Sequence, residues 1–148
     1  MSSIELDEKD WQILKALSRN ARIPFAELAR NLGLSDVAVL KRVKRLEQFG
    51  IIRGYTLNID YSKLGFRLTS LTGIDVEPEY LFTVAEKLKN MENVKYVAIT
   101  SGDHNIMVKI VARDQSELMK MHEEISKMTG VKRVCPSIVL EILKDEVL

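Results

Sequence analysis

The sequence predicts an α+β protein, with a winged helix-turn-helix domain followed by a ferredoxin-like βαββαβ domain. Three observations lead to this prediction. Apolar residues recur at helical spacing near the N-terminus, and the helix-ending Gly33 is followed closely by the helix-capping Ser35. The rest of the chain alternates twice between strand-like and helical patterns. We expect domains at 1–53 and 66–148, joined by an extended hinge at 54–65.

A first helix is predicted to begin after Asp7. A carboxylate at a helix start accepts hydrogen bonds from the first backbone amides, so Asp7 suits the N-cap position. Apolar residues then recur at helical spacing and predict a buried face that includes the single tryptophan of the chain. The residues of this face are Trp11, Ile13, Leu14 and Leu17.

A second and a third helix follow, with a very short turn between them. Pro24 has the fixed φ of a helix start, and Gly33 can take the left-handed conformation that ends a helix. Only Leu34 separates Gly33 from Ser35, which is a good N-cap for the third helix. Two helices joined by so short a turn cross steeply, which is the helix-turn-helix arrangement. Beyond the third helix, residues 51–60 alternate and predict a small wing or an outgoing strand.

Positive charge is concentrated around the third helix. The whole chain has a formal net charge of +1, but residues 19–53 hold eight Lys or Arg against three Asp or Glu. On a helical wheel, Val39, Val43 and Leu46 form the packed side, and small and cationic residues form the opposite side. A solvated basic face is the simplest interpretation of an isolated helix of this kind. The preceding helix-turn-helix pattern favours binding to double-stranded DNA instead.

This composition suits a DNA major groove. Small side chains near a helix start let the backbone approach base edges, while long cations behind them reach phosphates or guanine. Backbone amides at the start of the third helix can hold a phosphate, and arginines outside it can reach the flanking backbone. The predicted DNA contacts are Ser35, Val37, Ala38, Lys41, Arg42, Lys44 and Arg45, with Arg19, Arg22, Arg30 and Arg53 on the flanks.

Residues 66–148 have a different pattern, in which a strand, helix and strand unit occurs twice in tandem. Two such units predict a ferredoxin-like sandwich with its helices on one face of the sheet. Pro136 cannot donate to a β-ladder, so we expect the last strand at a sheet edge or with a bulge. The neighbouring Cys135 is expected to be half-buried, and a lone cysteine cannot form an internal disulfide.

The sheet face without helices is expected to be apolar and to need a cover. A second copy of the chain is the simplest cover, so we predict a homodimer through this domain. The apolar residues expected on this face are Leu71, Val97, Ile99, Met107, Val111, Val139 and Leu143.

Targeting signals are not evident in the sequence. No apolar run approaches the roughly 18 to 20 residues that cross a bilayer. The N-terminal MSSIELDEKD is acidic and polar, where a signal peptide would be basic and then apolar. We therefore expect a cytoplasmic protein with no membrane partner.

Six motifs match a known family at its spacing. They are LDEKDWQIL (Leu6–Leu14), NAR (Asn20–Arg22), ELARNLGLS (Glu27–Ser35), RVKRLEQFGIIRGY (Arg42–Tyr55), LG (Leu64, Gly65) and SGDHN (Ser101–Asn105). Along nearly its whole length, the chain resembles the Lrp/AsnC (feast/famine) family of prokaryotic transcriptional regulators. The resemblance implies a DNA-binding domain, a hinge, and a ligand-sensing domain whose dimers often assemble into tetramers or octamers.

The resemblance also implies a small effector, usually an amino acid, bound between dimers near the turn after the second strand. No other cofactor is expected. The effector-binding residues implied are Thr100, Ser101, Gly102, Asp103, His104, Asn105 and Ser137.

Two positions depart from the family's usual pattern. Pro24 stands where Ser or Thr is common, so the second helix starts from proline's fixed φ and not from a side-chain cap. Asn105 stands where many members carry an aspartate, which would pair with an effector's ammonium group more strongly than an amide does. The difference corresponds to about 1 to 2 kcal/mol, or roughly ten-fold in affinity. We expect Asp103 to compensate in part and Asn105→Asp to tighten amino-acid binding.

Two other functions are kept as alternatives. Some proteins resembling this family decarboxylate tetrapyrroles, and His104 or Arg133 can be imagined at such a site, although an enzyme has no need of the basic stripe. The second alternative is a DNA-architectural protein without an effector. A metal or catalytic site is not expected, because the other histidine, His122, lies on a separate predicted helix and no cysteine or carboxylate cluster has ligand spacing.

Overall fold

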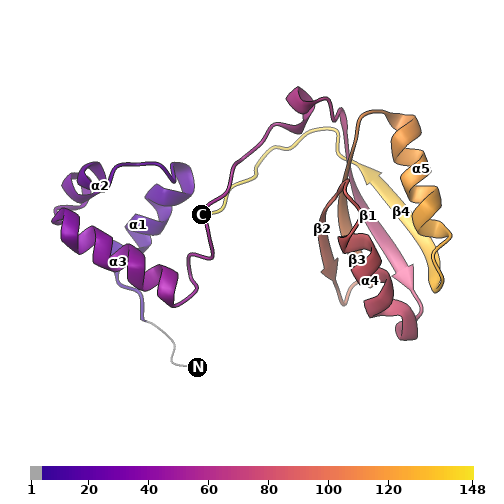
Figure 1. The fold of residues 1–148 in the computed structure, drawn as a ribbon, viewed down its shortest axis with the longest axis horizontal. Coiled ribbons are helices and arrows are strands. Elements are labelled where there is room, and N and C mark those ends of the chain that lie inside the picture. Colours follow the sequence, from indigo (N-terminus) through magenta and orange to yellow (C-terminus); the bar gives the residue numbers. More distant parts are fainter. Residues whose placement is uncertain (1–4) are drawn as a thin grey trace. The chain divides into compact units, whose positions relative to one another are not determined.

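The computed structural model describes residues 5–148, which form two compact units (Figure 1). One unit runs to Asn58 and also contains Lys144–Leu148, and the other unit is Ile59–Leu143. The sequence-based division had placed residues 144–148 with the second domain. Each unit has its own hydrophobic core, so each is described by itself.

The N-terminal unit contains three helices, as predicted. They are α1 (Glu8–Arg19), α2 (Phe25–Leu32) and α3 (Asp36–Gln48). Asp7 caps α1, Gly33 ends α2 with a left-handed φ of 63°, and the Ser35 hydroxyl accepts a hydrogen bond from the Ala38 amide at the start of α3. Pro24 precedes α2 without a side-chain cap, so that helix starts from proline's fixed φ. The short turn between α2 and α3 is therefore confirmed.

The three helices enclose a small aliphatic core. Its buried side chains are Ile13, Leu14, Leu17, Leu28, Ala29, Val39, Val43 and Leu46. Trp11 is not part of it, because 46% of this residue is exposed, and the prediction of a buried tryptophan was wrong. At 100° per residue, Trp11 lies roughly 110° from the centre of the apolar stripe of α1, on its flank.

A wing is absent from the described part of the N-terminal unit, so the expectation of a winged domain was wrong. Residues 53–60 have no regular secondary structure, and residues 5–58 contain no strand. A strand needs a partner for its backbone hydrogen bonds, and a wing needs two strands joined by a turn. Residues 51–60 supply the alternating pattern of one strand without a second segment to pair with.

The second unit has the βαββαβ order that the sequence predicted. Its elements are η1 (Tyr61–Leu64), β1 (Leu68–Val76), η2 (Pro78–Tyr80), α4 (Leu81–Lys89), β2 (Val94–Ile99), β3 (Ile106–Ala112), α5 (Gln115–Ser126) and β4 (Val131–Ile138). The strands form one antiparallel sheet in the order β2-β3-β1-β4, and α4 and α5 pack against it (Figure 1). β4 is an edge strand, and Cys135 on it is half-buried, as expected.

The helix-free face of the sheet differs from its predicted composition. An irregularity early in β2 shifts the alternation by one residue, so Val97 pairs with Val108 and Ile99 with Ile106. These partners lie in the core beneath the helices, and Val97 and Ile99 therefore face the helices, contrary to the prediction. Leu143 lies beyond the last strand and is largely exposed. Leu71, Met107 and Val111 lie on the open face, as predicted. The pairing also places there Thr69, Gly73, Tyr96, Ala98 and Lys109.

A polar chain is buried in the helix-covered side of this unit. The Ser70 hydroxyl lies 2.8 Å from the Thr72 hydroxyl, which lies 2.9 Å from Nε2 of His122 on α5. Ser70 and Thr72 are fully buried, and burial lowers the pKa of His122 below its ordinary value. The folded protein therefore favours the neutral imidazole.

The free energy of unfolding of the second unit should fall on mild acidification. A histidine with a lowered folded-state pKa binds fewer protons when folded than when unfolded, so stability rises with pH. The stability is fully present above the ordinary histidine pKa of about 6.5 and is lost as the pH falls from there through the folded value. Denaturant titrations at pH 7.5 and 5.5 measure the difference in the free energy of unfolding between the two pH values. The substitution His122→Gln should make this difference smaller. An unchanged difference between the two pH values in that variant would contradict the assignment.

Candidate nucleic-acid interface

The predicted DNA contacts of α3 fall into two groups, of which the first is exposed. Lys41 and Lys44 are exposed, and neither takes part in an ion pair or side-chain hydrogen bond within residues 5–148. Val37 near the helix start is 59% exposed, and the adjacent Ala38 is half-buried. A small first turn followed by two available ammonium groups is the arrangement expected of a helix that enters a major groove.

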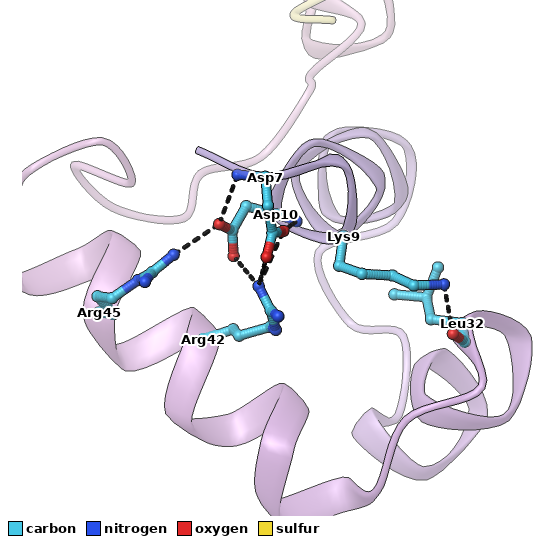
Figure 2. Close-up of polar contacts among 6 residues, drawn as sticks. All are labelled: Asp7, Lys9, Asp10, Leu32, Arg42 and Arg45. Atoms are coloured by element: carbon cyan, nitrogen blue, oxygen red, sulfur yellow. Dashed lines mark hydrogen bonds and ion pairs between the residues drawn. The ribbon is translucent and has the colours of Figure 1, made fainter. Parts of the chain in front are cut away.

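The second group, Arg42 and Arg45, contacts the N-terminal end of α1 (Figure 2). Nη1 of Arg42 lies 2.7 Å from Oδ2 of Asp7 and 2.8 Å from Oδ1 of Asp10, and Nη2 of Arg45 lies 2.6 Å from Oδ2 of Asp10. The side chains of Arg42 and Arg45 are only 27% and 42% exposed. The sequence assigned both arginines to DNA, and the structure gives them partners inside the protein.

Asp10 is the centre of this contact and is completely buried. It also belongs to a capping box, in which the backbone amides of Asp7 and Asp10 each donate to the other residue's carboxylate. The amide of Asp10, and then the Arg42 guanidinium, hold the pKa of the Asp7 carboxyl below its usual range. The two carboxylates in turn raise the pKa of Arg42.

The same turn of α1 also contacts the end of α2. The ammonium group of Lys9 donates to the carbonyl of Leu32 at 2.7 Å, next to the left-handed Gly33 (Figure 2). A cation at this place satisfies one of the carbonyls that a helix end leaves without a partner. One turn of α1 therefore contacts both helices of the helix-turn-helix.

Sequence reasoning missed Asp10, although a signal was present. Asp10 lies three residues before Ile13 and four before Leu14, so it continues the buried stripe of α1. A carboxylate on a buried stripe requires a charged or hydrogen-bonding partner. The nearest candidates were the arginines of the third helix, which had been assigned to DNA.

The remaining predicted DNA contacts are exposed. Arg19 ends α1, Arg22 follows in the loop, Arg30 lies on α2, and Arg53 follows α3. The Ser35 hydroxyl is occupied by the cap of α3, which leaves its backbone amide at the helix N-terminus for an anion.

The segment that follows α3 is hydrogen-bonded back to the helix. The Tyr55 hydroxyl donates to Oε1 of Glu47 at 2.8 Å. Burial of the phenol, with the neighbouring Glu47 carboxylate, raises the pKa of Tyr55 to about 12. This hydrogen bond joins the segment that follows the helix to the last turn of α3.

In the second unit, the turn between β2 and β3 holds six of the seven predicted effector residues. Its ends are joined by a hydrogen bond from the Thr100 amide to the Asn105 carbonyl, and the Thr100 hydroxyl donates to the His104 carbonyl. The Asn105 side chain accepts from the Val76 amide at 2.9 Å and donates to the Val76 carbonyl at 2.7 Å. Both ends of this amide are thus used inside the fold, and a carboxylate at 105 would meet the Val76 carbonyl without a proton to donate. This geometry argues against tighter effector binding by Asn105→Asp.

A polar group that the sequence did not predict lies beside this turn. Asp75 on β1 contacts Nδ1 of His104 at 2.8 Å and Nε of Arg133 at 2.7 Å. The hydrogen bond from His104, followed by that from Arg133, lowers the pKa of the Asp75 carboxyl. Gly73 has no side chain, which leaves room for the His104 ring.

The seventh predicted effector residue, Ser137, lies apart within this unit. It pairs with Leu71 on β1, whereas Arg133 pairs with Asp75, four residues along the same strand. At 3.3 Å per residue this separation is about 13 Å. Within one copy of the chain, Ser137 is therefore not brought to the turn.

Other sites are not evident in the described part of the chain. Residues 5–148 contain no group of three or more His, Cys, Asp or Glu that could hold a metal ion. None of the helices in the same range is long and apolar enough to span a membrane.

The short turn between α2 and α3 and the exposed cations of α3 define a helix-turn-helix DNA-binding protein with a second, ferredoxin-like domain. Sequence models identify its two parts: an AsnC-type helix-turn-helix domain at residues 6–47 and an Lrp/AsnC ligand binding domain at residues 69–148. The chain belongs to the Lrp/AsnC family, and it is a DNA-binding transcriptional regulator with a ligand-binding domain. This assignment excludes the enzymatic alternative.

The similarity to known proteins covers nearly the whole chain. The HTH-type transcriptional regulator LrpA of Pyrococcus horikoshii is 52% identical over 140 residues, which are 94% of this chain and 99% of the relative. The structure of E. coli AsnC superposes with a TM-score of 0.89 at 26% identity, over 98% of this chain and 99% of that one. The regulator NMB0573 of Neisseria meningitidis, solved as a complex with L-Met, has the same fold at 22% identity, with a TM-score of 0.90 over 97% and 95% of the two chains.

Proposed function

We propose that the protein regulates transcription as a dimer that presents two copies of α3 to successive major grooves on one face of the DNA. The observation that carries this proposal is the pair of exposed cations Lys41 and Lys44 on the second helix of a helix-turn-helix, neither of which forms an ion pair with any of residues 5–148. A two-fold dimer reads an imperfect palindrome, because the symmetry of the site follows that of the protein. The partner is double-stranded DNA.

The open face of the sheet supports dimerisation through the second unit. Leu71 and Tyr96 on this face are 47% and 58% exposed in the single chain, and Met107 beside them is half-buried. A ferredoxin-like sheet covered by helices on one side leaves such a face for a second copy. Tetramers or octamers of these dimers complete the proposed assembly.

Lys44→Ala should weaken DNA binding and flatten its salt dependence. A cation that neutralises a phosphate releases counterions, so its loss lowers the slope of log K against log salt by about one per binding site. Fluorescence anisotropy with a labelled duplex, measured from 50 to 200 mM salt, gives this slope. Lys87→Ala is the control, because it removes the same charge from an exposed lysine of α4. A Lys44→Ala slope equal to that of wild type would refute the assignment of α3 to DNA.

The second unit is proposed to bind an amino acid at the β2–β3 turn, between dimers. The matched ligand binding domain supports this proposal, as does an NMB0573 structure of the same fold that contains L-Met. At the turn, Asp103 offers an exposed carboxylate for an ammonium group, and Arg133 offers a guanidinium 62% exposed for a carboxylate. An effector bound between dimers would shift the assembly equilibrium and so change how many copies of α3 engage one DNA molecule.

Asp103→Asn should weaken amino-acid binding by about ten-fold, since a charged hydrogen bond becomes a neutral one. Isothermal calorimetry with each proteinogenic amino acid in turn, beginning with L-methionine, measures the loss. Glu124→Gln, on an exposed part of α5, is the matched control. If no amino acid binds wild type or changes its assembly size or DNA affinity, the effector-independent architectural function is supported instead.

A further inference from the structure

We propose that Asp10 is a positioning residue for DNA recognition. Its carboxylate holds the Arg42 and Arg45 guanidinium groups against α1 and so fixes α3, which leaves Lys41 and Lys44 as the cations of that helix that contact phosphate. The inference rests on the proposed function, because it assumes that α3 enters the DNA.

The first argument is the burial of the carboxylate. Asp10 is fully buried, and both of its oxygens have donors: Oδ1 accepts from Arg42, and Oδ2 accepts from Arg45 and from the Asp7 amide. A buried carboxylate that loses its cationic partners keeps the cost of its desolvation without the compensating attraction. The arginines are therefore strongly retained by Asp10.

The second argument is the geometry of the arginines. Nε of Arg45 is buried and has no hydrogen-bond partner within residues 5–148, while Nη2 of the same side chain donates to Asp10. Nη1 of Arg42 donates to the carboxylates of both Asp7 and Asp10 (Figure 2). Turning either arginine to a phosphate means breaking contacts that are already formed.

The consequence concerns specificity. Arginines and lysines that bind phosphate supply affinity that is independent of sequence, and base contacts supply the discrimination. Two of the four clustered cations, Arg42 and Arg45, are paired with carboxylates of the protein itself. This pairing limits the affinity for DNA that is independent of sequence. Two ion pairs from the first turn of α1 to successive turns of α3 also fix the direction of the helix, and base readout requires such a fixed direction.

The first experiment compares neighbouring cations of α3. Lys44→Ala is expected to reduce the salt slope of duplex binding by about one per site. Arg45→Ala is expected to leave the slope unchanged, because Arg45 contacts Asp10 and not phosphate. Equal reductions in both variants would overturn the inference while keeping the proposed function. No reduction in Lys44→Ala would instead overturn the proposed function.

The second experiment frees the arginines. Asp10→Asn removes the charge that holds them, so the salt slope with random duplex should steepen by about one to two per site, and the preference for a selected operator fragment should fall about ten-fold. Adding Arg45→Ala to Asp10→Asn should return the slope toward that of wild type. Glu8→Gln removes the same charge two residues earlier, where the side chain accepts a hydrogen bond from Gln12 and contacts no arginine within residues 5–148, and it should change neither quantity.

Circular dichroism establishes that each variant is folded at the temperature of the binding assay. Slope and preference equal to wild type in folded Asp10→Asn would overturn the inference, as would the same change in Glu8→Gln. If Asp10→Asn does not fold, the comparison of Lys44→Ala with Arg45→Ala decides alone, because Arg45→Ala leaves Asp10 paired with Arg42.

Discussion

Leu46→Ala is expected to unfold the N-terminal unit and abolish DNA binding while the second unit stays folded. Leu46 is fully buried in the small core of the three helices. Truncation of a buried leucine costs about 2 to 5 kcal/mol through lost burial and the cavity left behind. A three-helix core of this size supplies a net stability of only about 3 to 5 kcal/mol. The substitution therefore removes most or all of the stability of this unit.

Two measurements check this result. Thermal unfolding followed by circular dichroism should lose the helical signal of the N-terminal unit at low temperature and keep a later transition from the second unit. Anisotropy should show no binding to a duplex. Leu57→Ala is the control, because Leu57 is 79% exposed in the same unit and its truncation should change stability by less than about 0.5 kcal/mol. A Leu46→Ala protein that binds DNA as wild type does would contradict the core assignment.

Gly130→Ala has the second largest expected effect, a loss of about 3 kcal/mol from the second unit. Gly130 has a φ of 89°, which costs a residue with a Cβ about 1 to 2 kcal/mol. An added Cβ would also overlap Cβ and Cγ of Tyr80, which are close to the backbone and cannot swing away. Overpacking of this kind costs about 1 to 3 kcal/mol more. The Gly130 carbonyl accepts from the Glu77 amide at 2.8 Å, so the strain reaches the start of η2.

Chemical denaturation monitored by circular dichroism measures this loss. Gly102→Ala is the matched control, because an added Cβ at Gly102 meets nothing within 4 Å, and its φ lies outside the left-handed region. Gly102 also lies in the proposed effector turn, so the control shows whether that turn tolerates a methyl group. Equal stabilities of the two variants would show that the approach of Tyr80 to Gly130 is less restrictive than the structure indicates.

The elements of the fold were predictable because local chemistry and tertiary packing agree. Asp7, Gly33 and Ser35 each end or begin a helix by backbone hydrogen bonding that the residue type itself determines. Pro136 correctly indicated an edge strand, since it lacks the amide that a central strand must donate. Such signals depend on a few neighbouring residues and are therefore visible in the sequence.

The parts that were not predictable depend on residues distant in the chain. The side chain of Arg42 is directed toward α1 by an aspartate 32 residues earlier, and a helical wheel contains no such information. The irregularity in β2 reversed the faces of Val97 and Ile99, because a shift of one residue exchanges the two sides of a strand. Asn105 was compared with a ligand-binding aspartate, and its amide instead binds the backbone of Val76.

The two separate hydrophobic cores of the described chain have a consequence for its evolution. None of the buried side chains of one core belongs to the other, so each half can accept substitutions under its own constraints. Recombination at a junction near Asn58 and Ile59 would then leave both cores intact, because Lys144–Leu148 of the first unit contribute to neither core, and a chimera could combine these three helices with the sensor of another regulator. Such exchange offers a physical route by which one DNA-binding domain comes under the control of a different small molecule.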